Sequence, residues 1–63
     1  MALERGVKFE WHKNDITYYT HKSFTAADEN AIDVLVAAHI EVEKENDRNA
    51  TFVQSTKVET REV

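Results

Sequence analysis

The sequence predicts an α+β fold of order ββαβ, in which one long helix packs on a small antiparallel three-stranded sheet. Three observations predict it: alternation of apolar and polar residues on both sides of a turn within 7–21, a segment over 26–47 that contains the mainly apolar run 31–42 and no glycine or proline, and a β-rich stretch over 51–58. With 63 residues, the chain is expected to form a single small domain, residues 1–63, with a thin core.

The first two strands are predicted to form a hairpin. Both segments are rich in aromatic and β-branched residues, which favour strands. Asn14 and Asp15 lie between them, and both residue types tolerate the positive φ of a two-residue turn. This turn fixes a register with the following opposed pairs: Lys13 with Ile16, Trp11 with Tyr18, Phe9 with Thr20, and Val7 with Lys22.

The register gives the hairpin two unlike faces. One is an aromatic-rich core face made of Val7, Phe9, Trp11, Ile16 and Tyr18. The other is polar and carries Lys8, Glu10, His12, Thr17, Tyr19 and His21. An exposed aromatic ring on a sheet can stack single-stranded bases, so single-stranded nucleic-acid binding on this polar face is one alternative function. A solvated face is the simpler interpretation, because no basic groove accompanies Tyr19.

The helix is predicted to begin near residue 26, after a capping pair formed by Thr25 and Asp28, and to end at Asn46 or Asp47. The stretch over 51–58 follows as the third strand. Its alternation is irregular, because Phe52 and Val58 would share a face while Val53 points the other way. A bulge or an edge position explains such a pattern.

The helix carries two apolar stripes, although a surface helix normally carries one. We assign the first stripe to the sheet; it contains Ala31, Val34, Leu35, Ala38 and Val42. We assign the second to a homodimer interface; it contains Ile32, Val36 and Ile40, with His39 at its edge. The alternatives are a sheet that curls further around the helix, or a different protein that binds the stripe. A buried His39 would make a dimer sensitive to pH.

Charge is distributed unevenly along the chain. The net charge is −4, and the segment 28–48 carries seven acids against Lys44 and Arg48. Such a surface attracts basic partners, of which nucleic-acid-binding proteins are the strongest. A solvated face that keeps a small protein soluble is the alternative interpretation. The partner-binding residues expected first are Glu41, Glu43, Glu45 and Asp47, followed by Asp28, Glu29 and Asp33.

In its size, charge asymmetry, lack of cysteine and lack of an enzyme motif, the whole chain resembles the small acidic phage proteins that imitate DNA and inhibit host proteins. The resemblance implies a role in host takeover, as a DNA mimic that occupies the nucleic-acid surface of a host protein. No residue motif carries the resemblance, so it transfers no site. The sequence alone does not distinguish such an inhibitor from a structural or interaction subunit that uses the apolar stripe.

Other functions find little support in the residues. There is no cysteine, and no two of the three histidines lie at metal-ligand spacing, so neither a metal site nor a cofactor is expected. One glycine is too few for a phosphate-binding loop, and no nucleophile motif occurs, which predicts a protein without catalytic residues. We expect a soluble cytoplasmic protein that binds neither nucleic acid directly nor a membrane.

Overall fold

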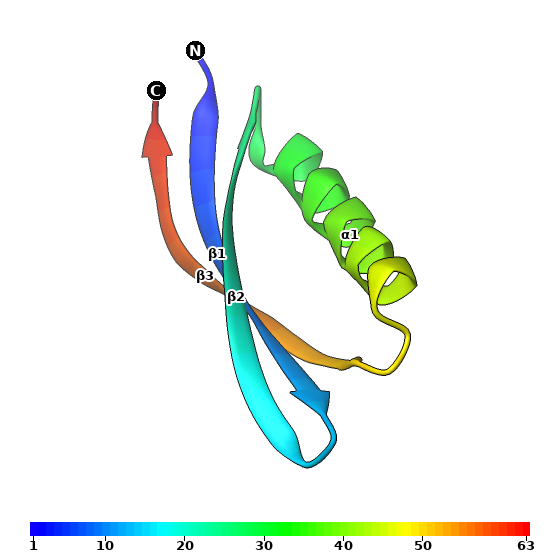
Figure 1. The fold of residues 1–63 in the computed structure, drawn as a ribbon. Helices are drawn as coiled ribbons and strands as arrows, with labels where there is room; N and C mark the ends of the chain where they lie inside the picture. The colour runs from blue at the N-terminus through cyan, green and yellow to red at the C-terminus, as the bar shows by residue number, and fades with distance from the viewer.

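The computed structural model describes residues 1–63 and has the predicted element order. Strands β1 (Leu3–Lys13) and β2 (Ile16–Ala26) are followed by helix α1 (Glu29–Asn46) and strand β3 (Thr51–Glu62). The sheet order is β2-β1-β3, with both neighbours antiparallel to the central strand β1. Figure 1 shows the long, twisted strands of this sheet with α1 lying along one of its faces. The α+β prediction is confirmed.

The hairpin has the register that the turn predicts. Trp11 is paired with Tyr18 and Phe9 with Thr20, and all four predicted pairs occur. Asn14 and Asp15 have φ values of 52° and 64°, which is the left-handed pair that a type I′ turn requires. The turn residues and the alternation therefore specify the same register, and only this pairing buries the aromatic face.

The helix begins later than predicted because β2 continues to Ala26. Phe24 is buried in the core, with its ring 6.3 Å from that of Phe9, and this packing keeps the chain extended beyond the predicted boundary. Asp28 is itself the N-cap, and its side chain accepts a hydrogen bond from the N–H of Ala31 at 2.8 Å. The predicted capping pair of Thr25 with Asp28 is therefore wrong.

The helix stripe that faces the sheet is not the predicted one. Ile32 is fully buried, and Val36 and Ile40 pack against the same core. His39 also faces the sheet, with its ring 5.1 Å from that of Phe9. Assigning Ile32, Val36, Ile40 and His39 to a dimer interface was wrong, because these side chains complete the core of one chain. The core consists of Val7, Phe9, Trp11, Phe24 and Ile32.

Strand β3 is irregular, as its sequence predicts. Its pairing with β1 shifts register twice, once beside Val53 and once beside Val58. Phe52 lies on the helix side, 5.3 Å from the Trp11 ring, whereas Val58 lies beside Gly6 on the other face. The prediction that Phe52 and Val58 share a face is wrong, because each bulge inserts one residue and changes the alternation.

Candidate interaction surface on the helix

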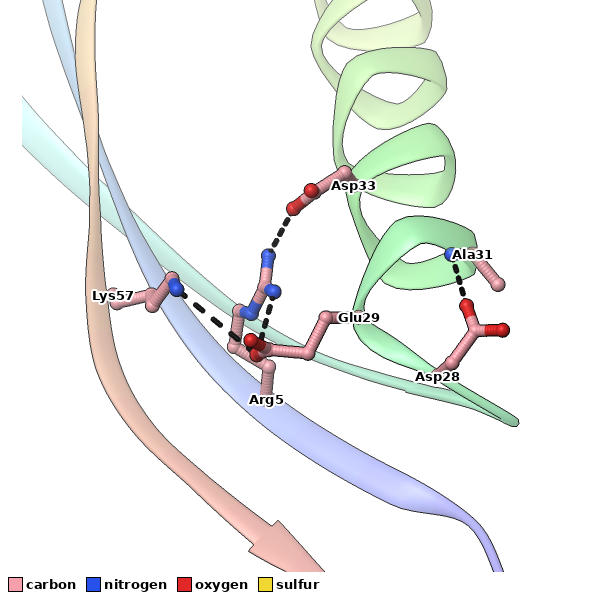
Figure 2. A network of polar contacts seen from close by, with 6 residues as sticks. All are labelled: Arg5, Asp28, Glu29, Ala31, Asp33 and Lys57. Carbon is pink, nitrogen blue, oxygen red and sulfur yellow. Dashed lines mark hydrogen bonds and ion pairs between the residues drawn. The ribbon is translucent and has the colours of Figure 1, made fainter.

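Two of the acids expected to bind a partner instead bind a buried arginine. Arg5 extends from β1 toward the first turns of α1, and its side chain is only 5% exposed. Its Nη1 donates to Oδ1 of Asp33 at 2.6 Å, and its Nη2 donates to Oε1 of Glu29 at 3.0 Å (Figure 2). These hydrogen bonds, first to Asp33 and then to Glu29, raise the pKa of Arg5. Lys57 of β3 approaches the same oxygen of Glu29 at 4.0 Å.

A third acid joins the far end of the helix to the hairpin. Lys13, at the end of β1, donates from Nζ to Oδ2 of Asp47 at 2.7 Å. The other oxygen of Asp47 accepts from the backbone N–H of Asn49 at 3.2 Å. The hydrogen bond from Lys13 is the main cause that lowers the pKa of Asp47. This carboxylate therefore stabilises the exit from α1 and already has its own cationic partner.

Glu41 and Glu45 have a different environment. Both side chains are 73% exposed, and they lie one helical turn apart. Lys44 lies 3.6 Å from Glu41 and Arg48 lies 3.0 Å from Glu45, each three residues along the chain. Exposed pairs of this kind contribute little stability, since solvent screens them and the side chains are free to reorient. These two carboxylates therefore remain available to a partner.

Glu43 is intermediate between the two groups of acids. It is partly buried, and its Oε1 lies 3.9 Å from Nε2 of His39. Because His39 packs on the rings of Phe9 and Phe24, Glu43 lies near the sheet side of the helix. The seven predicted acids thus do not form one surface: four serve the fold, one is intermediate, and two face outward.

Three basic residues from the sheet reduce the acidity of the helix. Arg5, Lys13 and Lys57 lie beside helix acids, although they are distant from them in sequence. Together with Lys44 and Arg48 they place five basic groups among the seven carboxylates. Sequence analysis missed Arg5 in particular. Its place on the apolar side of the β1 alternation was the available signal, since Arg5, Val7 and Phe9 are two residues apart.

Beside Glu41 and Glu45 lies an exposed apolar stripe, which we call the outward stripe. Val34 is 69% exposed and Val42 is 55% exposed, so neither contributes to the core. At 100° per residue, Glu41 and Glu45 fall along one edge of this stripe. The outward stripe consists of Ala31, Val34, Leu35, Ala38 and Val42.

The open face of the sheet offers a weaker candidate site. Tyr19 is half exposed there, but Nζ of Lys8 lies 5.0 Å from the centre of its ring and covers part of it. Acidic side chains lie between the basic ones on this face. Glu10 accepts a hydrogen bond from Gln54 at 2.9 Å, and Glu4 forms an ion pair with Arg61. The face therefore lacks the continuous positive charge that single-strand binding uses.

Clefts and metal-ligand clusters add no further site. The space between α1 and β3, about 280 Å³, opens to solvent, and its charged groups already bind one another. No cluster of three or more histidine, aspartate or glutamate side chains has the arrangement of a metal site. The single helix does not combine the length and the apolar character needed to cross a membrane.

Comparison of the chain with protein-family models, with curated protein sequences and with solved structures returns no match.

Proposed function

We propose that this protein is a non-catalytic binding protein that recognises a basic nucleic-acid-binding protein through the outward carboxylates of α1. The observation that carries the proposal is the exposure of Glu41 and Glu45, one turn apart on a helix whose axis the sheet holds in place. Occupying the nucleic-acid surface of the partner would inhibit it. This is the role that the resemblance to small acidic phage inhibitors implies.

The two carboxylates have a spacing that suits a phosphate-binding surface. Residues four apart on a helix have Cβ atoms about 5–6 Å apart, a scale comparable with successive phosphates of a nucleic-acid strand. Binding would exchange the exposed partners Lys44 and Arg48 for basic groups of the other protein. The exchange costs little because each original ion pair is exposed. Complementary charge would also accelerate association.

A second candidate is an interaction subunit that uses the outward stripe. The exposure of Val34 and Val42 favours it, because large apolar side chains at neighbouring positions of one helix face form a docking surface. The two candidates differ in their dependence on salt. Binding through carboxylates weakens as salt rises, whereas binding through apolar side chains does not.

The test uses the immobilised full chain to retain proteins from a cell lysate at low salt. We expect one basic nucleic-acid-binding protein to be retained, to elute at high salt, and to be displaced by duplex DNA. The double variant Glu41→Gln, Glu45→Gln should lose this retention. A matched control is Glu59→Gln, Glu62→Gln, which removes the same charge from exposed positions of β3.

The proposed site would be supported if the β3 variant retains the basic protein and the helix variant does not. Equal retention by both variants would contradict it. A retained protein that resists salt and is not displaced by DNA would instead favour the interaction subunit.

A further inference from the structure

We infer that the outward stripe is a homodimer interface, in which two α1 helices pack antiparallel with Ala38 at the two-fold axis. The occupant of the stripe is thus a second copy of this chain. This inference is independent of the proposed function, because it concerns the chain without any other protein.

The first support is the small core of one chain. Only five apolar residues are buried, and the chain has no cysteine with which to form a disulfide. Domains of this size commonly gain stability by association when disulfides and metals are lacking. The outward stripe is the place where α1 has apolar side chains left to cover, because Val34, Leu35 and Val42 are exposed.

The second support is the order of side-chain sizes along the stripe. Ala38 lies at its centre and lets two helix backbones approach, while Val34 and Val42 lie four residues to either side. A two-fold axis at Ala38 therefore places Val34 of one copy level with Val42 of the partner subunit, and the reverse. Leu35 lies level with position 41 of the partner subunit, outside this central contact. Val34, Ala38 and Val42 are thus complementary in size to their own antiparallel copies.

The third support is the charge along the helix. Parallel packing would place the acidic C-terminal halves of both helices, which contain Glu41 and Glu45, at the same end of the dimer, where like charges repel. Antiparallel packing separates these acidic segments. It sets each beside the first turns of the other helix, where Glu29 and Asp33 already bind Arg5 on the opposite side. Charge therefore selects the antiparallel arrangement.

The contact area is sufficient for a dimer of moderate affinity. The 18 residues of α1 extend over about 27 Å, and two such helices packed along their length bury on the order of 1,000 Å² in total. That area is at the lower limit for specific interfaces, so we expect a dimer that dissociates on dilution. In this antiparallel dimer, Glu41 and Glu45 of both copies lie on the same side of the helix pair.

The test is sedimentation of the purified chain at protein concentrations up to about 1 mM, which detects dimers of millimolar Kd. We expect a shift with concentration from 7.3 kDa toward twice that mass. Ala38→Glu should remove the shift, whereas Ala37→Glu should not. The control is closely matched, because both alanines are exposed and the second lies about 100° away on the helix.

A wild-type chain that stays at 7.3 kDa throughout would overturn the inference. So would a dimer that persists in Ala38→Glu, since the interface would then lie elsewhere. Both glutamate variants lie on the outside of α1, so retained helical circular dichroism checks that they fold.

A cysteine variant tests the position of the axis. The natural chain has none, so Ala38→Cys introduces a single thiol. Under mild oxidation, Ala38→Cys should form a disulfide-linked dimer much faster than Ala37→Cys, because only residues close to the axis reach disulfide geometry. Equal rates for the two variants would contradict an axis at Ala38.

Discussion

Nη1 of Arg5 donates a hydrogen bond of 2.6 Å to Oδ1 of Asp33, and this contact joins the central strand to the second turn of the helix. Because the guanidinium is buried, its charge must be compensated, and this carboxylate and that of Glu29 compensate it. The contact also fixes the rotation of α1. With Glu29 and Asp33 turned toward Arg5, Ile32 and Val36 necessarily face the sheet.

Asp33→Asn should lower the free energy of unfolding by about 1–2 kcal/mol. The variant weakens a hydrogen bond to a buried charge, and the exposure of Asp33 moderates the loss. Urea unfolding followed by the fluorescence of the single tryptophan, Trp11, measures it. Glu59→Gln, an exposed control, should change stability by less than about 0.5 kcal/mol. An equal effect of both variants would show that Arg5 does not depend on Asp33.

The ion pair of Lys13 with Asp47 should make stability depend on acid pH. The pKa of Asp47 in the folded chain is lowered, so its stabilising contribution is present above the unfolded value of about 4 and is lost as pH falls through the folded value. Asp47→Asn should therefore reduce stability at pH 7. The difference from wild type should shrink as pH decreases below about 4. A difference that is constant down to pH 2 would contradict this pairing.

Lys13 should give the corresponding effect at high pH. Its pKa is raised, chiefly by the hydrogen bond to Asp47, so its contribution is present below about pH 10.4 and is lost as pH rises through the folded value. Lys13→Met should abolish the additional loss of stability that wild type shows at alkaline pH. Lys22→Met, at an exposed position of β2, serves as the control.

Substitutions on the two stripes should differ sharply in how much they lower the free energy of unfolding. Ile32→Val removes one buried methyl group and should cost about 0.5–1.5 kcal/mol, because Ile32 is fully buried. Val34→Ala should cost less than about 0.5 kcal/mol, since that side chain is mostly exposed. Both should be measured in the Ala38→Glu background, so that association does not contribute. The reverse order of costs would show that the helix faces the sheet with its other stripe.

The hydrogen bond from the indole of Trp11 to Thr20 should contribute to stability. Its Nε1 donates to Oγ1 of Thr20 at 3.1 Å in the buried layer between sheet and helix. Thr20→Val keeps the shape of the side chain but leaves this donor without an acceptor, which should cost about 1–3 kcal/mol. Thr17→Val, on the open face, should be neutral or slightly stabilising. Equal costs would show that the hydrogen bond adds nothing.

The hairpin was predictable because its information is local. The turn residues Asn14 and Asp15 and the alternation on both sides of them specify one register, and that register was confirmed. The existence of the helix was predictable for the same reason. Its first residue was not, because the burial of Phe24 extends β2, and this burial depends on packing against both Phe9 of β1 and His39 of α1.

The choice between the two stripes was not predictable from periodicity alone. Both have helical spacing, so periodicity does not distinguish the stripe that faces the sheet from the one that faces outward. The deciding contacts are long-range: Arg5 is 28 residues from Asp33, and Lys13 is 34 residues from Asp47. In these same contacts, several of the acids predicted to bind a partner bind basic residues of the sheet instead. Of the predicted acids, Glu41 and Glu45 are the two that we propose to bind the partner.

The most direct test of the central claim is the salt dependence of binding to the basic protein retained from the lysate, measured by titration calorimetry. For wild type, log Kd should rise steeply with log salt. For Glu41→Gln, Glu45→Gln, affinity should fall and the slope should decrease, whereas Glu59→Gln, Glu62→Gln should keep the wild-type slope. A helix variant with the affinity and slope of wild type would contradict recognition through the outward carboxylates.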